Sequence, residues 1–417
     1  MVTFFATSWR RTYVTQSPEI DLFSSAAKAN PYPSYALVRS SDPVYNLKME
    51  DGSTRWLITR YEDTLAILKD QRFIKDVRRL LTPEQLEQTQ QNAYSALSAH
   101  MLSSDPPDHT RLRALVNISF TPRLVEQWRE RIQILADELI DTIEQQEERE
   151  VDLIDAFAFP LPIVVITEML GVPSEDRASF REWSNALLDA TGKPEDFQGT
   201  QEKVSAFAMY LHNLIKTKRQ QPGDDLIGRL LVAEADGDKL NETELISMIF
   251  LLLVAGHETT VNLIGNGTLA LLQYPEQKQL LQENPPLIKN AIEEFLRFHS
   301  PVALGTSRWV GEDLEFGGKQ MRRGDPVLVS LAAANHDPEE FALPDELDIT
   351  RQENRHLAFG MGIHYCLGAP LARLEGKIAI NTLLRRLPNL RLAVPAEELV
   401  WRPSMLLLGV SKLPVAF

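Results

Sequence analysis

Cys366, the only cysteine of the chain, lies in a glycine-rich stretch just ahead of a predicted helix. Gly360 and Gly362 permit a tight loop with positive φ, and Pro370 with the periodic apolar residues after it is typical of a helix start. Free N–H groups and the positive end of the helix dipole would stabilise the sulfur as an anion, which is both a nucleophile and a metal ligand. Taken alone, a lone cysteine also fits a buried, inert side chain.

A second set of reactive side chains lies in the hexapeptide 255–260, within a long apolar stretch. It combines a helix-weakening glycine, an acid and two threonines, which fits a kinked core helix whose threonines bond back to the preceding turn. The same acid and hydroxyl could also deliver protons to a reacting group. His257 and Glu258 do not form a zinc-protease motif, because His-Glu-x-x-His requires a histidine where the chain has Val261.

One long helix must position this hexapeptide. Asn241, with Glu244 three residues later, predicts a helix N-terminus, and no proline interrupts the sequence before Pro275. The helix could therefore extend over about 30 residues, or about 45 Å, which is the diameter of a whole domain. We expect it to cross the centre of the molecule.

The remaining patterns indicate a mainly α protein with small β-sheets. Residues 45–58 alternate around Asp51-Gly52 and predict a hairpin, and residues 82–85 form a capping box with proline at the first helical position. Further helices are expected at 123–145, 161–170, 179–188 and 203–218, and strands at 327–331 and 390–394. No linker or repeat divides the chain, so we predict a single domain over residues 1–417, with 1–18 as a loosely ordered N-terminal extension.

Composition narrows the class of function. The 43 basic and 58 acidic side chains give a net charge of −15, which disfavours a nucleic-acid partner. With one cysteine no intramolecular disulfide can form, and this fits a reducing compartment. The apolar N-terminal stretch and the run at 246–255 are both too short to span a bilayer. We therefore expect a cytoplasmic protein without a membrane anchor.

Residues 359–368 resemble the haem-binding loop of the cytochrome P450 family. The family pattern Phe-Gly-x-Gly-x-His-x-Cys-x-Gly is matched at every fixed position. The resemblance implies a cytochrome P450 fold, with haem b buried between the long central helix and the cysteine loop. Cys366 would then be the axial thiolate ligand of the haem iron, and Phe359, Gly360 and Gly368 would belong to the cofactor-binding loop.

The hexapeptide 255–260 is similar to the oxygen-binding signature of the same family, Ala/Gly-Gly-x-Asp/Glu-Thr-Thr, and matches it in full. The resemblance assigns the catalytic positions to Ala255, Gly256, Glu258 and Thr259. In this assignment Gly256 opens a groove for dioxygen and Thr259 hydrogen-bonds it. Glu258 relays protons to it through water.

Two further motifs of the family are present. Glu294 and Arg297 match Glu-x-x-Arg, which in this family is a buried structural ion pair. The usual third partner, an arginine of a Pro-x-Arg-Phe element, is missing after Pro344, and Arg351 is a candidate substitute. Haem propionates need cationic or imidazole partners, and four positions resemble them: His109, Arg113, Arg308 and His364.

The resemblance implies a bacterial haem-thiolate monooxygenase that hydroxylates or otherwise oxidises a hydrophobic small molecule, using O2 and two electrons from NAD(P)H. The predicted pocket walls are the segments 85–101, 184–211, 302–304 and 406–410. Two alternatives remain open, namely a haem-thiolate peroxygenase driven by peroxide and a non-catalytic haem-binding sensor.

Electrons are expected from a separate protein, because no flavin or iron–sulfur motif is visible in the chain. The predicted partner is a ferredoxin or flavodoxin with its reductase. A basic patch of Arg111, Arg123, Arg373 and Lys377 is the predicted docking site on an otherwise acidic monomer.

Overall fold

The computed structural model describes residues 20–22, 24–49, 52–90, 97–176, 179, 183, 194–233, 238–402 and 404–417. The predicted N-terminal extension, nearly all of the expected helix 179–188, and parts of the predicted pocket walls 85–101 and 184–211 lie outside these ranges.

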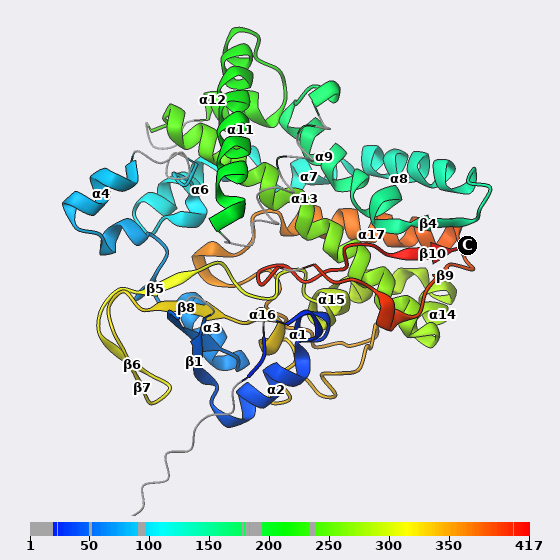
Figure 1. Ribbon diagram of the computed structural model, residues 1–417. Helices are drawn as coiled ribbons and strands as arrows, with labels where there is room; N and C mark the ends of the chain where they lie inside the picture. The colour runs from blue at the N-terminus through cyan, green and yellow to red at the C-terminus, as the bar shows by residue number, and fades with distance from the viewer. Residues whose placement is uncertain are drawn as a thin grey trace, which may run out of the picture.

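The helix α13 (Glu242–Gln273) passes through the middle of the molecule (Figure 1). It begins with the predicted capping box, since the side chains of Asn241 and Glu244 each accept a hydrogen bond from the other residue's backbone. It has 32 residues, close to the expected length. Among the described residues α13 alone is long and apolar enough to cross a membrane, but 67% of its most apolar window is buried inside the protein, as in a core helix.

Four of the described α-helices pack most extensively against α13 and fix its place in the core. They are α9 (Pro160–Leu170), α11 (Pro194–Gln220), α15 (Ile288–Phe298) and α17 (Ala369–Arg386). The prediction for 161–170 is confirmed, and α11 extends beyond the predicted 203–218 at both ends. Other helices are α1 (Ser25–Ala29), α2 (Tyr32–Ser41), α3 (Tyr61–Lys69), α4 (Pro83–Gln90), α6 (Asp108–Ser119), α12 (Leu226–Val232), α14 (Pro275–Glu283) and α16 (Leu331–Ala334).

The prediction of one helix over 123–145 is wrong. The chain forms α7 (Pro122–Glu126) and α8 (Arg129–Glu144), with a turn between them in which the Trp128 N–H donates to the carbonyl of Val125 at 3.0 Å. Both helices contact α17, so the turn lets the chain follow that helix. No glycine or proline marks the break in the sequence.

The larger sheet has five strands in the order β1-β2-β8-β5-β3. Its strands are β1 (Val44–Lys48), β2 (Thr54–Ile58), β3 (Phe73–Ile74), β5 (Arg308–Val310) and β8 (Pro326–Val329). The predicted hairpin is confirmed by the antiparallel β1–β2 pair, and β2 pairs in parallel with β8 from much later in the chain. The strand expected at 327–331 ends at Val329, because Ser330 caps α16.

A three-stranded sheet joins the C-terminus to the middle of the chain. Its order is β4 (Glu150–Asp152), β10 (Pro414–Ala416) and β9 (Arg391–Leu392), and β6 (Leu314–Phe316) with β7 (Lys319–Met321) forms a separate hairpin. The strand expected at 390–394 is shortened to two residues. Sheets that connect early and late segments support a single domain over 1–417, which stays a prediction.

Candidate functional site

The cysteine loop is held in shape by its backbone. The Cys366 N–H donates to the carbonyl of Phe359 at 3.0 Å and closes the loop just before α17 begins at Ala369. Gly360 and Gly362 have φ values of 68° and 76°, which confirms the predicted positive φ. A Cβ on Gly362 would also lie 2.6 Å from the carbonyl oxygen of Leu68. A side chain at position 362 is therefore excluded both by conformation and by space.

Cys366 is accessible to solvent, yet protein atoms surround its sulfur densely. Burial raises the pKa of its thiol, whereas the N–H groups of Gly368 and Ala369 and the guanidinium of Arg113 lower it. The predicted effect of the helix start is thus present but smaller than the cost of burying charge. A cation bound to the sulfur would complete the deprotonation, as metal ligation does for thiols.

The four predicted propionate partners lie together beside Cys366. His109 and His364 stack edge to face, with 4.3 Å between ring centroids, and His109, Arg113 and Arg308 all lower the pKa of His364, with burial as the largest cause, to about 2. Both ring nitrogens of His109 and Nε2 of His364 are buried without a hydrogen-bond partner. Buried polar atoms are normally satisfied. An unsatisfied, mutually repelling basic cluster fits a group that carries carboxylates, such as haem.

Two members of this basic cluster were missed by the sequence analysis. The Lys75 ammonium is buried and donates to the carbonyls of Thr306 and Ser307, each at 3.0 Å, and burial holds its pKa well below the usual range. Burial also lowers the pKa of the imidazole of His100, to about 4. Neither residue lies in a motif of its own, so only the fold brings them to the cluster.

On α13, Ala255 and Thr259 share one face. Ala255 is exposed although most of the helix around it is buried, and the Thr259 hydroxyl donates to the Ala255 carbonyl at 3.0 Å. This is the back-bonding expected for a threonine within a helix, and it leaves the oxygen lone pairs free to accept. A Cβ on Gly256 would come within 3.1 Å of Ile166 on α9. The glycine therefore permits close helix packing, and its dioxygen groove stays a prediction.

Glu258 lies on a different side of α13 and is buried. Its side chain is 1% exposed, and its Oε2 lies 3.0 Å from Nη1 of Arg402, in the C-terminal segment. Nε2 of the equally buried His257 is 3.7 Å from the other carboxyl oxygen. Any proton that reaches this acid must therefore enter a buried site.

The structure brings Glu294 and Arg297 together as a fully buried pair. Arg297 donates to both carboxyl oxygens, from Nε at 2.8 Å and from Nη2 at 2.7 Å. Arg351 Nε is 3.1 Å from the same carboxylate, so the candidate substitute is in contact with it. Asn354 and the Asp348 N–H also donate to Glu294. The network ties α15 to the segment that leads into the cysteine loop.

A second ion-pair network lies beneath the loop. Arg373 of α17 donates to both carboxyl oxygens of Glu293 at 2.7 Å, and its guanidinium lies 4.5 Å from the ring centroid of Phe359. Nε2 of His356 is 3.0 Å from Glu293, and Arg373 also donates to the hydroxyl of Tyr365. Burial would raise the pKa of Glu293, but these partners prevail and lower it to about 2. Residues on both sides of Cys366 are thereby fixed to α15 and α17.

Two members of the predicted basic docking patch are already neutralised. Arg111 pairs with Glu244 and with Asp238, and Arg373 pairs with Glu293 as described. Arg123 is exposed and Lys377 is half-buried. Burial lowers the pKa of Lys377, and Arg373 and two further cations lower it as well, against the opposing effect of Glu293. The patch is therefore weaker than the sequence suggested.

Glu375 of α17 is a buried acid that no motif predicted. Burial raises the pKa of its carboxyl to about 8, against the smaller opposing effect of Thr260 on α13. The folded protein therefore holds this proton more tightly than the unfolded chain does. Its contribution to stability is complete below the unfolded pKa of 4.5 and is lost as the pH rises through about 8.

We accordingly expect Glu375→Gln to remove a loss of stability at alkaline pH. One pKa unit corresponds to about 1.4 kcal/mol, so the loss in the wild type is at most ~5 kcal/mol. The difference in Tm between variant and wild type should grow in favour of the variant between about pH 5 and about pH 9. Parallel Tm curves over this range would show that Glu375 ionises freely in the folded protein.

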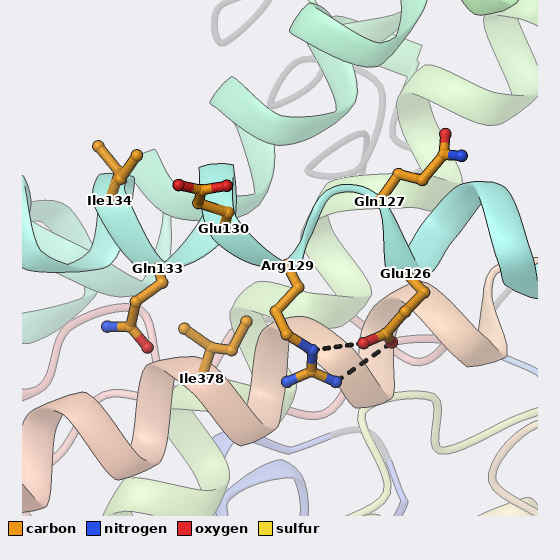
Figure 2. A pocket seen from close by; sticks show the side chains of 7 residues that line it. All are labelled: Glu126, Gln127, Arg129, Glu130, Gln133, Ile134 and Ile378. Carbon is orange, nitrogen blue, oxygen red and sulfur yellow. Dashed lines mark hydrogen bonds and ion pairs between the residues drawn. The ribbon is translucent and has the colours of Figure 1, made fainter.

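The described pockets do not coincide with this cluster. A hollow of about 520 Å³ is lined by Glu126, Gln127, Arg129, Glu130, Gln133, Ile134 and Ile378. Figure 2 shows Glu126, Arg129 and Gln133 pointing from α7 and α8 toward α17, with Arg129 bonded to Glu126, whereas Gln127, Glu130 and Ile134 point away from α17. The lining is mostly charged or polar and contains no predicted site residue, so it does not suit an apolar substrate. The predicted wall segments 302–304 and 406–410 do meet, through the bridge between Val302 and Leu407.

Comparisons with known proteins agree with this geometry. The family model described as Cytochrome P450 matches residues 34–396. Cytochrome P450 107B1 of Saccharopolyspora erythraea is 48% identical over 95% of this chain and 98% of its own. The vitamin D(3) 25-hydroxylase of Pseudonocardia autotrophica is 45% identical over 96% and 97%. The crystal structure of myxobacterial cytochrome P450 CYP267B1 with myristic acid superposes with a TM-score of 0.89, at 44% identity, over 95% of this chain and 98% of that one.

Proposed function

Because the chain belongs to the cytochrome P450 family and is a monooxygenase-type oxidoreductase, we propose that it oxidises a hydrophobic small molecule with electrons from NAD(P)H, delivered by a separate redox protein. Membership of the family implies haem with a cysteine thiolate ligand and the use of O2. The assignment of individual residues, the electron source and the substrate class are our proposals. So are its cytoplasmic location and monomeric state.

The unsatisfied basic cluster beside Cys366 carries the proposal. Cys366 would ligate the haem iron, and His109, Arg113, Arg308 and His364 would hold the propionates, with the Lys75 ammonium close by. Haem, when bound there, supplies the activation of dioxygen and the transfer of one oxygen atom to the substrate. The two ion-pair networks of Glu294 and Glu293 keep the cysteine loop in position.

The residues of α13 would handle the protons that this chemistry consumes. The Thr259 hydroxyl, oriented by its bond to Ala255, can accept a hydrogen bond from water and, after rotation, donate one to oxygen at the haem. Glu258 would take up protons from water and pass them toward Thr259. Both residues stand on a packed helix, which favours a fixed geometry over a flexible one.

The propionate assignment makes a direct prediction about haem retention. Charge-assisted hydrogen bonds contribute about 1.5–3 kcal/mol each, so Arg113→Ala should lose haem about 10- to 100-fold more readily. The rate of haem transfer to apomyoglobin measures this loss without turnover. Arg123→Ala removes an exposed arginine shortly after α6 and should leave the rate unchanged. Unchanged retention in Ala variants at all four predicted positions would refute the assignment.

The substrate is proposed to be apolar. A vitamin D(3) hydroxylase and a P450 that binds myristic acid are both similar to this chain, and the meeting wall segments 302–304 and 406–410 are rich in leucine. A library of sterol-like, fatty acid and polyketide compounds should therefore contain ligands that shift the haem absorption spectrum on binding. If only charged or strongly polar compounds produce the shift, the proposed substrate class is wrong.

The redox partner is proposed to be a small acidic ferredoxin or flavodoxin. Its docking would rely on exposed cations such as Arg123, since Arg111 and Arg373 are neutralised within the protein. NAD(P)H with a surrogate ferredoxin and its reductase should support turnover, and added salt should slow it. Peroxide-dependent product without NAD(P)H-dependent product would instead indicate a peroxygenase.

A further inference from the structure

Arg402 supplies Glu258 with its charge partner from a distant part of the chain. The segment 401–410 folds back on itself, with a bridge between Trp401 and Val410 and a bond of 2.9 Å from the Arg402 N–H to the Gly409 carbonyl. It places Nη1 of Arg402 3.0 Å from Oε2 of Glu258. The two side chains are 13% and 1% exposed, so the pair is largely withdrawn from water.

This segment is anchored on the same face of α13 that carries Glu258. Asn262 and Asn266 follow Glu258 at intervals of four residues, which places all three side chains in one row along the helix. Asn266 Nδ2 donates to the carbonyl of Leu408 at 2.8 Å. A Cβ on Gly409 would lie only 2.2 Å from Oδ1 of Asn262, so the backbone passes directly over that side chain. The close packing of this segment against α13 therefore fixes Arg402 next to Glu258.

His257 cannot replace Arg402 as a charge partner. Its Nδ1 lies 2.8 Å from the carbonyl oxygen of Leu253, which can only accept, so Nδ1 carries the proton. Burial lowers the pKa of His257 and keeps the ring neutral near neutral pH. Nε2 then presents a lone pair to Glu258 at 3.7 Å. Among the described residues, Arg402 is the one permanently charged side chain within ion-pair distance of Glu258.

We propose that Arg402 is a positioning residue of the proton relay, which keeps Glu258 ionised and oriented to accept a proton. The inference rests on the proposed function and adds a residue to it. Each proton that Glu258 releases toward Thr259 is replaced by one taken from water, so Glu258 ends as it began. Without the guanidinium, a buried carboxyl beside a neutral imidazole would retain its proton. It would then have no free site to accept the next one.

The ionisation of Glu258 can be followed without turnover. In infrared spectra of the ferric, substrate-free holoenzyme, the carbonyl stretching band of a protonated Glu258 is the one that disappears in Glu258→Gln. Loss of a neighbouring arginine should raise the midpoint of this band by about 1–3 pH units in Arg402→Gln. Arg402→Lys should restore most of the shift. Lys412→Gln removes an exposed cation two residues beyond the segment 401–410 and should leave the midpoint where it is in the wild type.

Turnover provides the second readout. Product formed per NAD(P)H should fall roughly 10-fold or more in Arg402→Gln, within the range of positioned proton transfer, and should recover in Arg402→Lys. An unchanged infrared midpoint in Arg402→Gln would show that Arg402 does not keep Glu258 ionised. A shifted midpoint with wild-type product per NAD(P)H would show that the ionisation of Glu258 does not matter for proton delivery. If the wild type forms no product with any electron donor, the proposed function fails and the relay with it. The infrared result would then still decide whether Arg402 sets the charge of Glu258.

Discussion

Cys366→Ala is expected to abolish the red-shifted Soret band that a thiolate ligand gives the ferrous carbon-monoxide complex. Cys366 is the only cysteine of the chain, so no second thiolate can take its place. The surrounding basic cluster can still bind propionates, so part of the haem should be retained with a different axial ligand. The absorption spectrum of the reduced, carbon-monoxide-treated protein measures the ligand, and the pyridine haemochrome assay measures the haem that remains.

The neighbouring Ile363→Ala serves as the matched control. Ile363 lies in the same loop and its side chain is 43% exposed, so its truncation changes the loop without touching the ligand. The control should keep the thiolate band at wild-type intensity. A thiolate band in purified Cys366→Ala would remove Cys366 from the proposed site and, with it, the basis of the mechanism.

Thr259→Ala is expected to separate oxygen activation from the rest of the protein's behaviour. Substrate binding, haem content and the carbon-monoxide spectrum should stay intact, because the bond that the hydroxyl makes to the described part of the chain lies within its own helix. Product per NAD(P)H should fall, by an amount bounded by the roughly 10²–10⁴-fold typical of positioned proton transfer. The missing electrons should appear as peroxide or water. Turnover driven by added peroxide should suffer less, since peroxide already contains the reduced oxygen pair.

Thr268→Ala is the control for this experiment. Thr268 is a buried threonine nine residues further along α13, or about 13 Å along the helix axis. Its loss changes the same helix in the same way but at a distance from the hexapeptide. Thr268→Ala should leave the amount of product formed per NAD(P)H unchanged. If both Thr259→Ala and Glu258→Gln form as much product per NAD(P)H as the wild type, the hexapeptide has no role in proton delivery and serves only helix packing.

The features that the sequence predicted correctly are those that depend on interactions between residues close together in the chain, such as helix capping and tight turns. The capping box of Asn241 and the absence of proline define α13, and the two glycines with positive φ define the cysteine loop. The hairpin of β1 and β2 follows from the alternating residues around Asp51-Gly52. The cysteine loop and the hexapeptide could be recognised because each motif occupies a few consecutive residues within one element, and their roles in ligating iron and binding oxygen stay predictions.

The features that sequence did not predict depend on contacts between distant segments. Lys75 joins the basic cluster and Arg402 reaches Glu258 only because sheets and a C-terminal turn bring them there. The burial of Glu375 depends on how α17 packs against α13. The partner of Glu258 could not be predicted for the same reason, since nothing in the hexapeptide reveals what covers this acid.

Incorporation of heavy-isotope-labelled dioxygen tests the central claim most directly. The purified protein would be supplied with NAD(P)H, a surrogate ferredoxin with its reductase, and a compound selected by its spectral shift. The product would then be analysed by mass spectrometry. A haem-thiolate monooxygenase should place one labelled atom in each hydroxylated product molecule, and Cys366→Ala should form none. An unlabelled product, or product that forms only with added peroxide, would contradict the account.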